Sequence, residues 1–175
     1  LDDEFKTDGS QFDRLLKDGE VLNAGTIQIT TLFTPGHTPA CVSYHINGNL
    51  FVGDALFMPD YGTGRCDFPA GSAADLYHSI HKRIYELPDE TKVYTGHDYL
   101  PNGRPLRFES TVAEEKKDNI HLKADTSMEA FVKLRNERDR TLAAPKLLLP
   151  SIQINIDAGR LPAVEKNGKR YLRIP

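Results

Sequence analysis

Three polar side chains with the donor atoms of a transition-metal site stand in similar local settings. His37, Asp54 and His97 each follow a short stretch rich in apolar or β-branched residues, and each lies directly after a glycine. A strand end gives such a side chain a rigid base, and a glycine lets the backbone bend sharply. Imidazole and carboxylate are the ligands shared by zinc and non-haem iron sites. The three residues together therefore predict a metal-dependent enzyme.

The other residues with reactive side chains form weaker patterns. His78 and His81 are three positions apart in an expected helix, but they lie away from its apolar stripe and are expected to meet solvent or a partner surface. Cys66 follows Arg65, whose charge would lower a thiol pKa, although a buried thiol is the preferred interpretation. Cys41 and Cys66 form no metal-spaced pair, and this cysteine usage favours a reducing, cytoplasmic location.

Composition argues against several other classes of protein. The net charge of −3 and the pI of about 6.1 give no broad attraction for nucleic acid. No run approaches the ~20 apolar residues that would span a bilayer, so no membrane partner is expected. The sequence also lacks the serine nucleophile elbow, the nucleotide-binding phosphate loop and the dinucleotide-binding glycine motif.

Four short strands are expected to position the three candidate ligands. They are residues 26–33, 42–46, 50–52 and 92–95. Asn47-Gly48 joins the second and third of them and is a strong hairpin signal. His37, Asp54 and His97 then follow the first, third and fourth strands.

Helices and a long loop are expected between and after these strands. Residues 57–71 read as a loop, and loops of that length are more often functional than filler. Ser72 begins a helix as its N-cap, and a second helix is expected over 111–119. A third, over 127–140, is expected to take Thr126 as its N-cap.

The remaining segments complete the secondary-structure prediction. Residues 100–110 contain three Pro or Gly residues and are expected to form a surface loop. From Ile152 to Ile156, isoleucine alternates with polar residues at the period of a strand. Pattern alone predicts mixed α and β structure, either α+β or a layered α/β sandwich.

The segments around the candidate ligands resemble the later metal motifs of the metallo-β-lactamase superfamily. They are Thr34-Pro35-Gly36-His37-Thr38, Gly53-Asp54 and Gly96-His97-Asp98-Tyr99, in the order and spacing of that family. The resemblance is close over residues 26–99 and looser beyond. It implies an α/β fold, the αββα sandwich, with metals at one edge of its two sheets.

Two branches of the superfamily offer different activities. Gly64-Arg65-Cys66-Asp67-Phe68 and the helix that follows resemble the persulfide dioxygenases, in particular a bacterial subset called β-lactamase-like hydrolases. That branch implies one Fe(II), with a thiol persulfide and O₂ as substrates and sulfite and free thiol as products. The alternative is a glyoxalase II-like thioester hydrolase with two zinc ions. A third interpretation is a non-catalytic fragment or interaction module.

Roles follow from the resemblance position by position. His37 and Asp54 match iron ligands. His97 matches a residue behind those ligands in the dioxygenases, or a ligand of the second metal in glyoxalase II.

Further positions match residues near the substrate. Thr38, Arg65 and Tyr99 match positions that meet the glutathione part, and the planar guanidinium of Arg65 suits a carboxylate. His121 stands where the mitochondrial-type enzymes carry an arginine near glutathione. The resemblance therefore leaves open whether the thiol that carries the persulfide is glutathione or another thiol.

The motif H-x-H-x-D-H, which supplies a further histidine ligand in this family, does not occur in the 175 residues. We therefore expect one partial domain: a lead-in over about 1–25, the C-terminal part of the sandwich over 26–140 and an extended tail over 141–175. We expect the missing motif to precede Leu1 and the isolated chain to be inactive. A sheet face left bare would favour a homodimer or aggregation.

Overall fold

A computed structural model describes residues 8–172 of the chain, which divide between two compact units. The larger unit is Lys17–Leu142 and carries every candidate site residue. The described part of the smaller unit comprises residues 8–16 together with 143–172.

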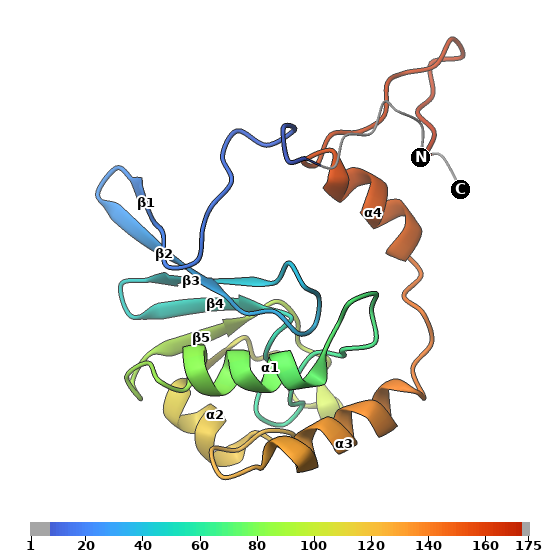
Figure 1. The fold of residues 1–175 in the computed structure, drawn as a ribbon. Helices are drawn as coiled ribbons and strands as arrows, with labels where there is room; N and C mark the ends of the chain where they lie inside the picture. The colour runs from blue at the N-terminus through green and yellow to red at the C-terminus, as the bar shows by residue number, and fades with distance from the viewer. Residues whose placement is uncertain (1–7, 173–175) are drawn as a thin grey trace. The chain divides into compact units, whose positions relative to one another are not determined.

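The larger unit is built on a six-stranded sheet in which the strands follow one another in chain order (Figure 1). The strands are β1 Val21–Ala24, β2 Ile27–Phe33, β3 Val42–Ile46, β4 Asn49–Gly53, β5 Lys92–Thr95 and β6 Glu109–Thr111. Neighbouring strands are antiparallel except β4 and β5, which run parallel. The four expected strands are confirmed, whereas the short edge strands β1 and β6 were not predicted.

The hairpin between β3 and β4 follows the turn chemistry expected from its sequence. Asn47 and Gly48 both have positive φ angles, +48° and +76°, and they lie between the paired residues Ile46 and Asn49. A two-residue turn of this kind matches the twist of the flanking strands. The turn therefore fixes the register that places the end of β4, and with it Asp54.

Besides a 3-10 turn at Pro101–Gly103, four α- or π-helical segments accompany the sheet in this unit. They are α1 Ala73–Ser79, continued by the π-helical turn Ile80–Ile84, α2 Val112–Asp118 and α3 Met128–Asp139. The N-cap predicted for α1 is confirmed, because the Ser72 hydroxyl accepts from the Asp75 N–H at 3.1 Å. The cap predicted for α3 is wrong by one residue: Ser127 caps the helix, and the Thr126 hydroxyl accepts from the Lys123 N–H instead.

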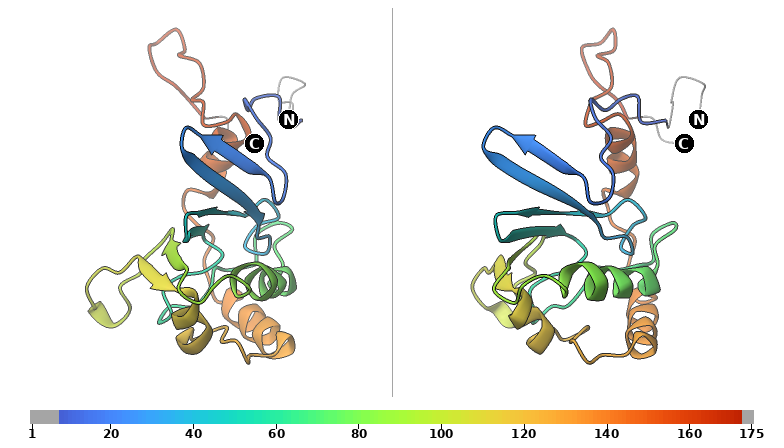
Figure 2. Two further views of the ribbon diagram at one scale, coloured as in Figure 1. Left: turned by 90° about the vertical axis from the view of Figure 1, so that its left-hand side faces the viewer. Right: turned by 60° about the vertical axis from the view of Figure 1, so that its left-hand side comes forward.

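The core lies between the sheet and the helices α1 and α3, which are neighbours on one side of β4 and β5 (Figure 2). Apolar residues of β4 and β5 meet the stripe of α1 and its π-helical continuation. They are Leu50, Val52, Val93, Leu76, Ile80 and Ile84, all at most 1% exposed. The opposite sheet face leaves large apolar side chains 38–44% exposed; these are Ile27, Phe33, Tyr44 and Phe51.

In the smaller unit, the strand predicted over Ile152–Ile156 is wrong. The segment belongs to a helix, α4 Leu148–Ile156. Ile152 and Ile156 are four residues apart, so the same alternation also places both on one helical face. Pro150 is tolerated because it stands in the first helical turn. The last residues of the expected tail, 173–175, lie outside the described part.

No helix among residues 8–172 combines the length and the apolar character needed to cross a membrane.

Candidate metal centre

The structure brings the three candidate ligands together around the carboxylate of Asp54. One oxygen, Oδ2, is 3.6 Å from Nε2 of His37, and the other, Oδ1, is 3.6 Å from Nε2 of His97. The parallel pairing of β4 with β5 sets Gly53 opposite Thr95, so the residues that follow each strand emerge side by side. The carboxylate thus lies between two imidazoles that come from different parts of the chain.

The His37 ring is held in the tautomer that suits a metal ligand. Its Nδ1 lies 2.6 Å from the backbone carbonyl of Arg65, which only accepts, so Nδ1 carries the proton. In the neutral ring the lone pair is then on Nε2, the atom that faces Asp54. The His37 side chain is 14% exposed, whereas that of His97 is 58% exposed. His37 is therefore the better oriented of the two histidines.

Two glycines let the backbone close up around this centre. A Cβ on Gly64 would lie 1.9 Å from the carbonyl oxygen of Asp54 and 3.2 Å from Nδ1 of His37. Gly36 has a φ of +141°, and a Cβ there would lie 2.4 Å from the backbone of Leu76 in α1. A side chain at Gly64 would push the loop away from Asp54 and His37, and one at Gly36 would push the turn that carries His37 away from α1.

The donor atoms suit iron or zinc, since two imidazoles and one carboxylate are ligands common to both metals. Within residues 8–172, however, no three His, Cys, Asp or Glu side chains converge closely enough to hold a metal ion. The described residues therefore do not form a complete metal site by themselves, and the metal-ligand roles of His37, Asp54 and His97 stay predictions.

The predicted substrate residues occupy different environments. Tyr99 is 52% exposed, and its ring centroid lies 5.9 Å from that of His97, beside the candidate ligands. The Thr38 hydroxyl lies 3.1 Å from Sγ of Cys41, within the turn that carries His37. The substrate-binding roles of both residues stay predictions.

Arg65 meets a carboxylate of the chain itself. Its Nε and Nη2 atoms donate to the two oxygens of Asp67, both at 2.6 Å, and its guanidinium lies 5.3 Å from the centre of the Phe68 ring. This is the planar two-point pairing that makes arginine suited to carboxylates. Asp67 takes one edge of the guanidinium, and the substrate-binding role of Arg65 also stays a prediction.

Tyr99 belongs to a group of rings beside the centre, here called the aromatic wall: Phe57, Tyr61 and Tyr99. Sequence reasoning named Tyr99 and missed the other two. The Tyr61 and Tyr99 rings are stacked, with centroids 4.4 Å apart and planes 17° apart. Phe57 packs edge-on against both, at 5.7 and 5.4 Å. It also lies 6.3 Å from the His97 ring. The signal available in the sequence was the long 57–71 loop, which carries two of the three rings.

A buried polar network also went unrecognised, and it holds the loop whose carbonyl orients His37. Asp139 of α3 accepts from the Cys66 N–H at 2.8 Å, and Arg135 donates to the Thr63 carbonyl at 3.0 Å. Arg135 and Asp139 form an ion pair with side chains 1% and 5% exposed. Nδ1 of His121 accepts from the Thr63 N–H at 3.0 Å. Helix α3 thus fixes the residues on either side of Arg65.

A family model described as the metallo-beta-lactamase superfamily matches residues 2–97, more than half of the chain. The chain belongs to the metallo-beta-lactamase superfamily. The α/β fold expected from the resemblance is confirmed by the six-stranded sheet with its covering helices and by structural neighbours of the same superfamily.

Three relatives of this metallo-beta-lactamase chain carry names that refer to different activities. Glyoxylase B2 of Dictyostelium discoideum is 54% identical, over 100% of this chain and 60% of its own length. A beta-lactamase hydrolase-like protein of Xylella fastidiosa is 53% identical, over 98% and 39%. The human mitochondrial persulfide dioxygenase ETHE1 is 41% identical, over 72% and 47%. The chain therefore spans less than two thirds of each relative.

Among solved structures, the crystal structure of ETHE1 from Myxococcus xanthus is similar, with a TM-score of 0.74 and 36% sequence identity. The match covers 83% of this metallo-beta-lactamase chain and 60% of that one. The fold and the relatives therefore agree on the superfamily, while the names of the relatives cover more than one activity.

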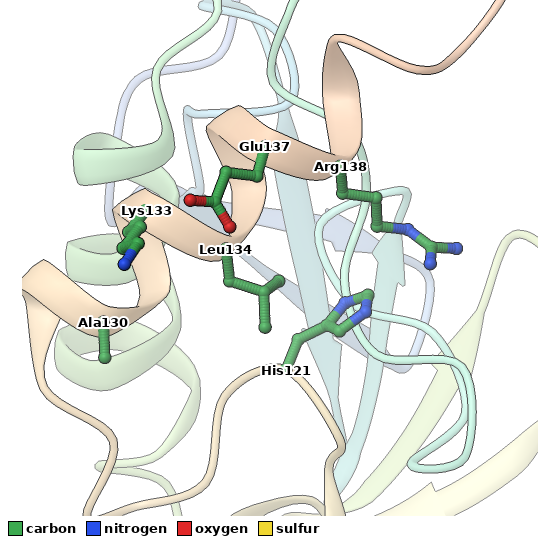
Figure 3. A pocket seen from close by; sticks show the side chains of 6 residues that line it. All are labelled: His121, Ala130, Lys133, Leu134, Glu137 and Arg138. Atoms are coloured by element: carbon green, nitrogen blue, oxygen red, sulfur yellow. The ribbon is translucent and has the colours of Figure 1, made fainter.

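His121 lines a surface pocket along α3 with Ala130, Lys133, Leu134, Glu137 and Arg138 (Figure 3). The ring points toward the helix, near Leu134 and Arg138. Burial lowers the pKa of His121 to about 3, and the charges of Arg135 and Arg138 add to the effect. The ring is therefore neutral at physiological pH and offers no cation where the mitochondrial-type enzymes are expected to carry an arginine.

Cys66 is buried, as the preferred interpretation held. Burial raises the pKa of its thiol to about 12, and the nearby Arg135 offsets this only in part. The thiolate is the reactive form of cysteine, so this thiol is unreactive at neutral pH.

Proposed function

We propose that the full-length protein is a cytoplasmic persulfide dioxygenase with a single Fe(II) held in part by His37 and Asp54. The observation that carries the proposal is the fixed orientation of His37, whose Nδ1–H donates to the Arg65 carbonyl while Nε2 faces Asp54. Ligating histidines almost always donate their other ring N–H to such a partner. His97, which is far more exposed, would stand next to the metal.

The proposed reaction converts a thiol persulfide, O₂ and water to sulfite and the free thiol. The terminal sulfur of the persulfide loses four electrons and gains three oxygen atoms, while the S–S bond breaks and the carrier leaves as a thiol. O₂ accepts the four electrons, and water supplies the third oxygen. No further reductant is needed.

The residues of this chain would hold and orient the reactants. The iron, once bound, would supply a site for the substrate sulfur and for O₂. Asp54 and His37 would fix its position, and a further histidine from the H-x-H-x-D-H motif would complete the ligand set. Tyr99 would line the approach for the thiol carrier, with glutathione as the first carrier to test.

A second candidate function is thioester hydrolysis at two zinc ions, as in glyoxalase II. Two observations favour it: each carboxylate oxygen of Asp54 faces a different histidine, and the relative with 54% identity is called a glyoxylase. In this function Asp54 would be shared by both metals, and His97 would be a ligand of the second.

Elemental analysis of the purified full-length protein tests the proposal, combined with O₂ uptake and sulfite formation from glutathione persulfide. About one iron per chain and one sulfite per O₂ would support the dioxygenase. Two zinc-like ions with thioester cleavage would replace it by the second candidate. If the protein shows neither metal nor turnover, both enzyme functions fail and the chain is an interaction module. The incomplete ligand set within residues 8–172 is the reason to include this outcome.

A further inference from the structure

The segment that follows the Gly96-His97-Asp98-Tyr99 motif is more than a surface loop. It runs from Leu100 to β6 and includes a short 3-10 turn, Pro101–Gly103. Leu100 and Asn102 adopt positive φ angles of +48° and +56°, which side chains of this kind seldom adopt. This backbone path brings Arg104 back over the motif, where its side chain is only 18% exposed.

Arg104 joins two carboxylates from segments that are distant in sequence. Its Nε and Nη2 atoms donate to Oδ2 and Oδ1 of Asp60 at 2.5 and 2.8 Å. Its Nη1 and Nη2 atoms donate to Oδ2 and Oδ1 of Asp98 at 2.7 and 2.8 Å. One guanidinium thus makes paired hydrogen bonds to both residues, a geometry that lysine cannot reproduce.

Asp98 is the fixed end of this arrangement. Its side chain is 2% exposed, and Oδ2 also accepts from the backbone N–H of Arg107 at 2.7 Å. Asp60 is the freer end, with a side chain 40% exposed. Without the guanidinium, two carboxylates would face each other at short range and repel.

Each of these carboxylates directly precedes one of the stacked rings in the chain. Asp60 precedes Tyr61 in the long loop, and Asp98 precedes Tyr99 after β5. Because the Arg104 guanidinium binds both carboxylates, here called the Arg104 tie, it also fixes the spacing of the two backbone segments that carry the rings. The Tyr61 and Tyr99 rings stack with centroids 4.4 Å apart, and Tyr99 lies next to His97.

We propose that Arg104 is a positioning residue that preforms the aromatic wall, and that Tyr61 is a substrate-contacting residue of that wall. The wall would receive the aliphatic and sulfur-bearing part of the thiol substrate, since ring edges and faces make favourable contacts with polarizable sulfur. The structural part of this proposal stands by itself, whereas the substrate contact rests on the proposed function.

The structural part is tested by fluorine NMR of the full-length protein carrying fluorotyrosine, with the Tyr61 and Tyr99 signals assigned by single Tyr→Phe variants. Arg104→Gln is expected to shift both signals toward unstacked positions. Arg107→Gln is the matched control: it removes an equal charge from the same segment, but only the backbone N–H of Arg107 contacts Asp98. Unchanged Tyr61 and Tyr99 signals in Arg104→Gln would overturn the proposal.

The substrate part is tested by a double-mutant cycle with Arg104→Gln and Tyr61→Ala. We expect each single variant to raise the KM for glutathione persulfide about threefold to tenfold with kcat and iron content unchanged. The double variant should raise the KM by less than the product of the two single effects, because Arg104 acts in part through the Tyr61 ring. Additive effects, or an equal loss of kcat, would refute the substrate contact.

Two further results keep these tests separate from the proposed function. If Arg104→Gln fails to fold, Asp60→Asn replaces it in the NMR test, because it weakens the Arg104 tie at its more exposed carboxylate. We expect Asp60→Asn to shift the Tyr61 and Tyr99 signals in the same way. If the unmodified protein shows no dioxygenase turnover, the proposed function fails, and the kinetic cycle is then run with a thioester substrate. An unshifted stack in both variants would overturn the role of Arg104 whatever the reaction.

Discussion

The proton on the His37 ring determines what this histidine offers to a metal. The Arg65 carbonyl fixes that proton on Nδ1, and the carbonyl is itself held by the contacts of Thr63 and Cys66 with α3. His97 has the same 3.6 Å spacing to Asp54 but a largely exposed side chain. The two histidines therefore differ in how firmly they are held, although their distances from Asp54 are equal.

This difference predicts unequal effects of substitution on metal content. Asp54→Ala in the full-length protein should abolish stoichiometric iron binding, because it removes the carboxylate between both rings. His97→Gln should keep about one iron per chain, since the proposed ligand set does not include it. Elemental analysis of both purified variants makes the measurement.

Asp89→Asn provides the control, as this carboxylate binds Lys116 at the surface, away from the site. Retained iron in Asp54→Ala would contradict the assignment of Asp54. Loss of one of two metals in His97→Gln would instead favour the binuclear hydrolase.

At the scale of elements, α2 and α3 act as supports for the long loop rather than as parts of the site. The side chain of Asn119, next to the end of α2, donates to the Gly62 carbonyl at 3.2 Å and to Glu115 at 2.8 Å. Glu115 also accepts from the Ser110 hydroxyl at 2.6 Å. Both helices thus contact the loop through buried polar groups, which are costly to leave unpaired.

Glu115 predicts a dependence of stability on pH. Burial raises its pKa to about 7, so between the ordinary value of 4.5 and 7 the folded protein keeps a proton that the unfolded chain releases. The free energy of unfolding contributed by this group therefore falls as pH rises through that window. Glu115→Gln, which mimics the protonated form, should gain about 1–3 kcal/mol relative to wild type between pH 5 and pH 8.

Urea unfolding of both proteins across this pH range measures the effect. The contribution of His121 cancels in the difference between the two proteins, because its environment is the same in both. A wild-type minus Glu115→Gln difference that does not change with pH would show that Glu115 titrates normally.

Two salt bridges that each join residues four positions apart predict very different costs of disruption. Arg135→Met leaves Asp139 buried without its partner and should lower the free energy of unfolding by about 3–5 kcal/mol. Lys82 and Glu86 form an exposed pair at 3.8 Å, with side chains 71% and 64% exposed. Glu86→Gln should cost less than about 0.5 kcal/mol. Chemical denaturation compares the variants, and equal costs would contradict the role of the buried network.

Prediction from sequence succeeded where the deciding interactions are local. The Asn47-Gly48 turn and the Ser72 cap each act within a few residues. The Arg104 tie joins residues 44 positions apart, so no local pattern marks it.

The remaining errors have different physical causes. The edge strands β1 and β6 depend on pairing with a neighbour, which composition does not reveal. The segment from Ile152 to Ile156 fits both a strand and a helix, because its alternation is too short to separate the two periods.

At the scale of the whole molecule, the larger unit has a sheet with one covered and one open face. Phe51 and Tyr94 stack at 5.1 Å on the open face, beside Tyr44, and none of these rings has a helix above it within residues 17–142. Contiguous apolar surface of this kind marks an interaction surface in soluble proteins. The homodimer expected from the sequence would use this face.

The 175-residue chain expressed alone is therefore predicted to self-associate through this face. Phe51→Lys should weaken dimerisation about tenfold or more, because it places a charge at the centre of the apolar surface. Leu106→Lys is the control, since Leu106 is 66% exposed but lies off the sheet face. Sedimentation velocity over a range of concentrations gives the dissociation constants. A monomeric wild-type chain, or equal effects of both variants, would contradict the prediction.

The parallel pairing of β4 with β5 has a consequence for how this family diversifies. The whole connection between the two strands, including the long loop and α1, leaves the sheet after Gly53 and returns to it at Lys92. The β4–β5 pairing keeps Asp54 beside His97, and the connection restrains this arrangement only where it touches it, as at Gly64. Evolution can therefore change the rest of the connection while the spacing of Asp54 and His97 is inherited unchanged.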